Sequence, residues 1–121
     1  MLSSHCQRLI VAAGLTDLLS VNCAHLTAFR NLCSKQANIF LTHWINGGFY
    51  ALESAFVMIH RNRVDEILKG IMHKDTCADD LDNLPRIFLT GAHSARNIYR
   101  CDGRRAIVLI GHMFLRMHVL K

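Results

Sequence analysis

The sequence contains few of the residues that interrupt regular secondary structure. Proline occurs once, as Pro85, and glycine occurs seven times in 121 residues. In a helix interior, proline costs about 3 kcal/mol and glycine about 1 kcal/mol relative to alanine. Their scarcity therefore permits long helices. Hydrophobic residues make up 51% of the chain, which excludes intrinsic disorder and is enough to form a buried core in a single domain.

The cysteine pattern lacks the signature of a secreted disulfide framework. The five cysteines are an odd number, and no two of them form a CxxC pair. Reduced thiols in the cytoplasm are the simplest interpretation. Membrane and mitochondrial locations remain alternatives, the latter because Asp17 is the only acid among the first 30 residues, which also contain Arg8 and Arg30.

Motifs that carry catalysis or bind cofactors are missing as well. The chain has no GxSxG, HExxH, P-loop or GxGxxG sequence. Its eight histidines are dispersed, and His73, Asp75 and Cys77 do not have a zinc-ligand spacing. We therefore predict that the protein is not an enzyme and that it has no metal site and no cofactor.

What the sequence does contain is apolar residues at three- and four-residue steps, the spacing of amphipathic helices. This spacing predicts four helices, at about His5–Ser20, Ala24–Ile45, Phe49–His73 and Leu84–Tyr99. The tail from Arg104 to Lys121 fits either a fifth helix, which is slightly favoured, or a β-hairpin around Gly111-His112. The predicted fold is all-α, a small bundle of four to five helices in a single domain spanning residues 1–121.

The positive charge is concentrated in the last third of the chain. Residues 1–83 contain seven Lys/Arg and eight Asp/Glu, whereas residues 84–121 contain seven Lys/Arg and a single acid, Asp102. Such asymmetry is typical of contact with an anionic partner such as nucleic acid. The plainer alternative is a solvated basic face.

A short stretch within this basic third suggests where nucleic acid would bind. Residues 89–100 resemble the turn and recognition helix of a helix-turn-helix, with Gly91 at the turn. The side chains predicted to reach bases or phosphates are Arg96, Asn97, Arg100, Arg104 and Arg105. We therefore predict a small nucleic-acid-binding accessory or regulatory protein.

Two other interpretations remain open. Asn38 to Ile59 is long enough to cross a membrane, which would make this a membrane-associated protein, although Glu53 within lipid would cost about 3 kcal/mol. The third interpretation is an open reading frame product with no evolved biochemical activity, which the unusual His and Cys usage permits.

Overall fold

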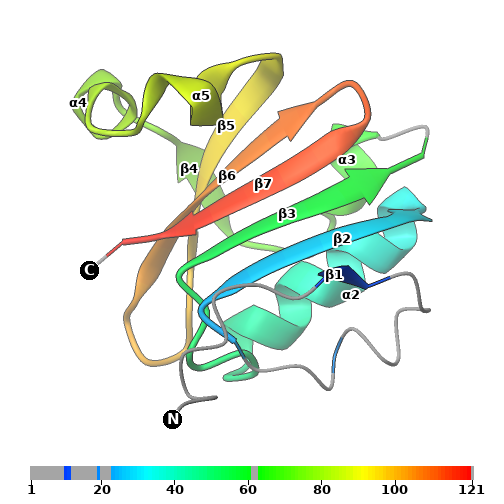
Figure 1. Cartoon of the computed structure of the whole chain (residues 1–121). Coiled ribbons are helices and arrows are strands. Elements are labelled where there is room, and N and C mark those ends of the chain that lie inside the picture. Colours follow the sequence, from blue (N-terminus) through cyan, green and yellow to red (C-terminus); the bar gives the residue numbers. More distant parts are fainter. Residues whose placement is uncertain (1–9, 12–18, 20–22, 61–62, 121) are drawn as a thin grey trace, which may run out of the picture.

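The protein is built around one mixed β-sheet (Figure 1). The computed structural model describes residues 10–11, 19, 23–60 and 63–120. Within these residues the sheet has seven strands in the order β1-β2-β3-β7-β6-β5-β4. The strands are β1 Ile10–Val11, β2 His25–Leu32, β3 Ser54–Ile59, β4 His73–Asp75, β5 Ala92–Tyr99, β6 Arg105–Gly111 and β7 Phe114–Val119.

Strand β3 separates a parallel half of the sheet from an antiparallel half. The strands β1, β2 and β3 are parallel, and the pairs β3–β7, β7–β6, β6–β5 and β5–β4 are antiparallel. The last strand in sequence, β7, therefore lies in the middle of the sheet. On β3, Ser54 is the register partner of His25 on one side and of His118 on the other.

Helix α2, Ser34–Ile45, packs on one face of the sheet and supplies the largest side chains of the core. It begins directly after β2, where the side-chain amide oxygen of Gln36 accepts a hydrogen bond of 3.0 Å from the Cys33 backbone N–H. Its buried residues recur at helical spacing, and Phe40 and Trp44 are completely buried. This stripe contacts the inward side chains of β3, namely Ala55, Val57 and Ile59.

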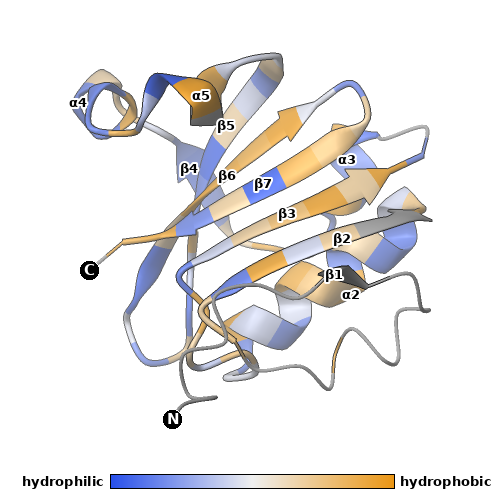
Figure 2. Ribbon diagram, viewed as in Figure 1, coloured by the Kyte–Doolittle hydropathy of each residue, from blue (hydrophilic) through white to orange (hydrophobic). Residues whose placement is uncertain are grey.

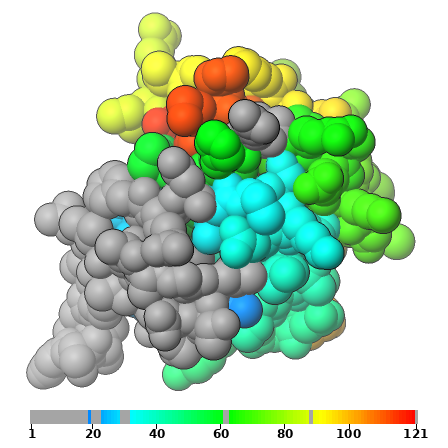
Figure 3. All heavy atoms as spheres, turned by 90° about the vertical axis from the view of Figure 1, so that its right-hand side faces the viewer, coloured from blue at the N-terminus to red at the C-terminus, as the bar shows by residue number. Residues whose placement is uncertain are grey.

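The short helix α3, Val64–Ile67, is tied to α2 through backbone groups. The Asn38 side chain on α2 donates hydrogen bonds of 2.8 Å to the carbonyls of Ile67 and Lys69. The Ser34 hydroxyl accepts a hydrogen bond of 2.8 Å from the Arg63 N–H. Residues of the two helices lie side by side on this side of the molecule (Figure 3).

The opposite face of the sheet is covered over only part of its width. Helices α4, Ala78–Asp82, and α5, Arg86–Leu89, lie over β5 and β6. A second apolar cluster forms beneath them, around the buried residues Leu84, Ile107 and Leu109. Because β6 is covered on both faces, its residues from Ala106 to Gly111 are all buried. β7 instead carries a hydrophilic segment between hydrophobic ones (Figure 2).

The prediction of an all-α bundle is wrong, because most of the expected helices are strands. Within the expected helix at 24–45, residues 25–32 form β2 and only α2 is helical. The expected helix at 49–73 holds β3, the single turn of α3 and the start of β4. The expected helix at 84–99 is helical only in α5, because residues 92–99 form β5 and pair with both β4 and β6. The expected helix at 5–20 lies largely outside the described residues, which there include only β1 and Leu19.

The structure also decides the predictions for the C-terminal tail and for the membrane-spanning segment. The hairpin alternative for the tail is confirmed, because β6 and β7 are antiparallel neighbours. The slightly favoured fifth helix is wrong. The stretch Asn38–Ile59, expected as a membrane-spanning alternative, is divided between α2, a turn and β3, and no helix of the described residues is long and apolar enough to cross a membrane.

Candidate functional site

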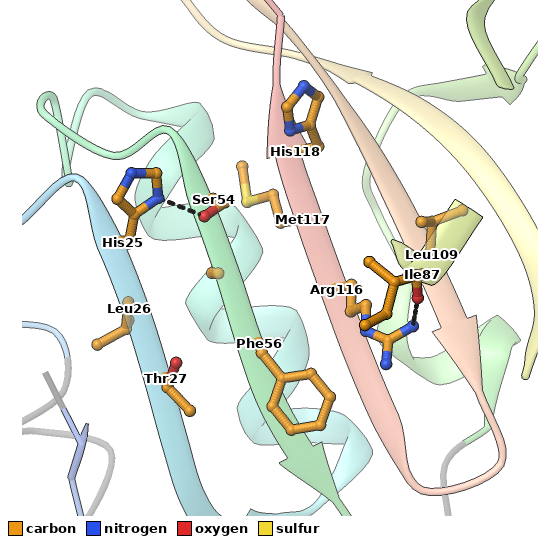
Figure 4. Close-up of a pocket in the computed structure, with 11 residues that line it drawn as sticks. His25, Leu26, Thr27, Ser54, Phe56, Ile87, Leu109, Arg116, Met117 and His118 are labelled. Atoms are coloured by element: carbon orange, nitrogen blue, oxygen red, sulfur yellow. Dashed lines mark hydrogen bonds between the residues drawn. The ribbon is translucent and has the colours of Figure 1, made fainter. Parts of the chain in front are cut away.

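A groove of about 260 Å³ lies where α4 and α5 leave the sheet uncovered. Its floor is the face of β2, β3 and β7 that points away from α2, and α5 forms one wall (Figure 4). Alternation along the strands places these side chains, since residues two apart in a strand share a face. The groove floor is formed by outward-facing side chains of these strands, namely those of His25, Thr27, Ser54, Phe56, Arg116 and His118.

One end of the groove is polar. His25, Ser54 and His118 occupy matching register positions on three adjacent strands, so that their side chains share this face. His25 Nδ1 and Ser54 Oγ are joined by a hydrogen bond of 2.7 Å (Figure 4). The polar end therefore offers imidazole and hydroxyl groups side by side.

The other end is aromatic and is organised by Arg116. The Phe56 and Phe114 rings stack with their centroids 5.9 Å apart, and the Arg116 guanidinium lies 5.4 Å from the first centroid and 4.5 Å from the second. Such cation–π contacts are worth about 0.5–2 kcal/mol each. Desolvation by burial lowers the pKa of Arg116 below its ordinary value.

Arg116 also fixes the wall of the groove. Its Nη1 donates hydrogen bonds of 3.0 Å to the Ile87 carbonyl and 3.1 Å to the Thr90 carbonyl, both at the end of α5. A cation at this position satisfies carbonyls that a helix end leaves without partners. Through this contact β7 holds α5 beside the groove, with the Ile87 side chain 69% exposed at the rim.

Two glycines make room for the aromatic end. A Cβ at Gly111 would overlap the Phe114 ring and lie 2.7 Å from the Gly91 carbonyl oxygen. Gly91 itself has a φ of +79°, which side chains rarely tolerate. The absence of side chains at both positions lets the Phe114 ring lie against the backbone and reach Phe56.

The ionisable side chains that line the groove are all basic. Its lining residues include Arg116 and two histidines, and none of them is Asp or Glu. The remaining lining side chains are hydroxyl-bearing or apolar. An anionic group can therefore enter without repulsion from a carboxylate, and an apolar group can pack on the apolar side chains.

The residues predicted to bind nucleic acid are not brought together on a recognition helix. Arg96 and Asn97 are neighbours in β5 and so point to opposite faces of the sheet. Arg96 pairs with Asp75 at 2.9 Å, and the side-chain amide oxygen of Asn97, Oδ1, accepts a hydrogen bond of 2.9 Å from the Thr76 hydroxyl. The expected helix-turn-helix is absent from this stretch because β5 is a strand of the sheet.

The other three predicted residues lie around the β5–β6 turn and also contact the protein itself. Arg104 donates a hydrogen bond of 3.2 Å to the Tyr50 carbonyl. Arg105 on β6 pairs with Asp80 on α4 at 3.0 Å. The third residue, Arg100, is buried, with 7% of its surface exposed.

Arg100 is the most constrained of these arginines. Its two terminal nitrogens donate hydrogen bonds of 2.8 Å to the Gly48 carbonyl and 2.7 Å to the Gly47 carbonyl, just beyond α2. Its guanidinium lies 5.6 Å from the Trp44 ring centroid, and its Nε lies 3.2 Å from an Asp102 carboxylate oxygen. These contacts give Arg100 a structural role, since they lock the end of α2 to the β5–β6 turn.

One signal for the groove is present in the sequence. Residues 115–119 alternate between apolar and polar, and in the strand alternative for the tail this places Arg116 and His118 on one face. His25, Ser54 and Phe56 were missed, because they lay within predicted helices. No local pattern links these residues to β7, which lies about sixty residues after Ser54 and Phe56 and about ninety after His25.

Comparison with known proteins gives one match. A family model described as F-box associated matches residues 1–57, fewer than half of the 121 residues. The matched span includes β2, α2 and most of β3, and with them His25, Thr27, Ser54 and Phe56 of the groove floor. No curated protein and no solved structure matches the chain.

The match indicates a protein-interaction role and gives no support to the predicted nucleic-acid partner. Nothing in the comparisons supports nucleic-acid binding, and contact between the five basic-third residues and nucleic acid stays a prediction. Among the described residues, no three His, Cys, Asp or Glu side chains are grouped so that they could hold a metal ion. The groove on the sheet is therefore the site to which a function is best assigned.

Proposed function

We propose that this chain is a protein-interaction domain that docks a segment of a partner protein in the groove over β2, β3 and β7. The observation that carries the proposal is the overlap between two independent features. The span matched by the F-box associated model supplies four of the floor residues, and the same residues line a groove of about 260 Å³ on the face of the sheet that α4 and α5 leave uncovered.

Binding is a better fit to this groove than catalysis. Phe56, Phe114 and Arg116 hold one another and the end of α5 through ring stacking and hydrogen bonds. Such mutual contacts make a preorganised surface, which lowers the entropy lost when a partner binds. The exposed apolar side chain of Ile87 at the rim is the kind of anchor that buried contacts with a partner would use.

Site-specific photo-crosslinking tests the proposal. A photoreactive amino acid replaces Thr27 in the groove in one form of the full chain and Lys69, beside α3, in a control form. We expect the first form, and not the second, to capture a specific protein from the source cells. That protein is then purified, and its affinity for the unlabelled chain is measured by calorimetry.

A matched pair of surface variants then locates the binding site. Ile87 and Met72 are both exposed apolar residues, 69% and 79% respectively, but only Ile87 lines the groove. Ile87→Ser should weaken binding of the captured protein about tenfold, the effect of losing ~1.4 kcal/mol of apolar contact. Met72→Ser should leave the affinity within about twofold of the parent value. Equal effects of the two substitutions would contradict docking in the groove.

A further inference from the structure

The two ends of the groove have different chemistry at a defined spacing. The polar end is centred on Ser54 and the aromatic end on Phe56, and both residues belong to β3. Residues two apart in a strand are separated by about 7 Å along the strand. Side chains i and i+2 of an extended peptide have this same spacing and also point to one side.

The polar end is suited to a singly charged anion. It presents the linked His25 and Ser54 side chains with His118 beyond them, and no carboxylate lines the groove to repel an acid. Arg116 supplies the guanidinium of the lining, but this group already donates hydrogen bonds to the carbonyls of Ile87 and Thr90. The Ser54 hydroxyl and the His25 imidazole can both donate hydrogen bonds, and a carboxylate is a singly charged acceptor for such donors.

The aromatic end is suited to an apolar side chain. The Phe56 ring is half-buried on the groove floor, and the exposed Ile87 side chain stands at the rim (Figure 4). An aliphatic side chain placed on the floor beside the Phe56 ring, on the side of the Ile87 rim, would lose contact with water. Burial of a leucine-sized side chain there would favour binding.

We infer that the groove selects an extended peptide segment carrying one Asp or Glu and one apolar side chain separated by a single residue. The inference rests on the proposed function and specifies the class of partner segment. The acid lies over the His25–Ser54 pair and the apolar side chain lies beside Phe56, on the side of the Ile87 rim. Because the peptide can run either way along β3, both orders of the two residues are compatible with the site.

Fluorescence anisotropy with a defined peptide set tests the inference. Fluorescein-labelled nine-residue peptides of Gly and Ser carry one Glu and one Leu, with zero to three residues between them, in both orders. We expect the full chain to bind a peptide with one intervening residue at least fivefold tighter than the other spacings. Replacing Glu by Gln in that peptide should weaken binding at least fivefold.

Variants of the chain assign each end of the peptide. His25→Leu should remove the preference for Glu over Gln while leaving residual binding through Leu. Ser54→Ala serves the same purpose if His25→Leu does not fold, as judged by circular dichroism. Ile87→Ser should weaken all peptides, and Met72→Ser should weaken none.

The outcomes separate this inference from the proposed function. Equal binding of Glu and Gln peptides, or tighter binding of a phosphoserine peptide, would overturn the inference, and sensitivity to Ile87→Ser would still support docking in the groove. A captured partner that needs Ile87 while no peptide of the set binds would also overturn the inference alone. Insensitivity of the captured partner to Ile87→Ser would overturn the proposed function.

Discussion

Replacement of Arg100 should destabilise the protein more than replacement of any other arginine of the β5–β6 turn. Arg100→Met removes two hydrogen bonds, to the carbonyls of Gly47 and Gly48, and the contact with the Trp44 ring. A hydrogen bond to a charged group contributes about 1.5–3 kcal/mol. The two carbonyls are in half-buried residues and regain water, so the expected loss is at the low end, about 3 kcal/mol in the free energy of unfolding.

The assay is urea unfolding followed by circular dichroism, with two comparison variants. Arg100→Lys keeps the charge but not the forked pair of donors, and should lose about half as much stability as Arg100→Met. Arg104→Met removes one exposed hydrogen bond of 3.2 Å, to the Tyr50 carbonyl, and should cost less than about 1 kcal/mol. If Arg100→Met unfolds within ~1 kcal/mol of the parent protein, the structural role assigned to this arginine is refuted.

Three further stability predictions can be checked by the same unfolding measurements. Gly111→Ala should cost about 2 kcal/mol, because its Cβ would overlap the Phe114 ring and a backbone oxygen; unchanged stability would show that the hairpin can shift to accept a methyl group. Trp44→Ala, in the completely buried core, should cost about 3–5 kcal/mol, and a loss below ~1 kcal/mol would argue against α2 packing on the sheet. Thr76→Val removes the hydroxyl that donates to buried Asn97 and should cost about 1–2 kcal/mol, whereas Thr76→Ser should retain most of that stability.

Helix α2 could be predicted from the sequence because its surroundings match its period. One side of the helix faces the sheet and the other faces solvent, so Ala37, Phe40, Leu41 and Trp44 recur at three- and four-residue steps. Strand β7 could be recognised for the same reason, because its side chains alternate between the two faces of the sheet with a period of two residues. Its buried residues alternate with half-buried ones along the whole strand.

The other strands were predicted as helices because their sequences do not show the apolar/polar alternation of a half-exposed strand. In β3 the inward residues Ala55, Val57 and Ile59 are apolar, but the groove side also carries Phe56 and Met58, so the polar alternation is lost. In β6 both faces are buried and the run from Ala106 to Ile110 has no period at all. Apolar runs of this kind fit a buried helix as well as a buried strand.

The groove could not be predicted from the sequence, because its floor depends on which strands are neighbours. His25, Ser54 and His118 meet only if β3 pairs in parallel with β2 and antiparallel with β7. Nothing local in the sequence specifies those two pairings. The basic third was visible as a charge excess, but five of its arginines are used to join elements of the fold.

The position of β7 has a consequence for how the chain reaches its folded state. Strand β3 is bonded along one side to a segment about thirty residues earlier and along the other to one about sixty residues later. Until Phe114–Val119 arrives, the earlier strands have an open edge where the middle of the sheet should be. The first half of the chain therefore keeps an exposed, aggregation-prone strand edge until its last strand pairs with β3. We expect slow folding and a need for chaperone protection.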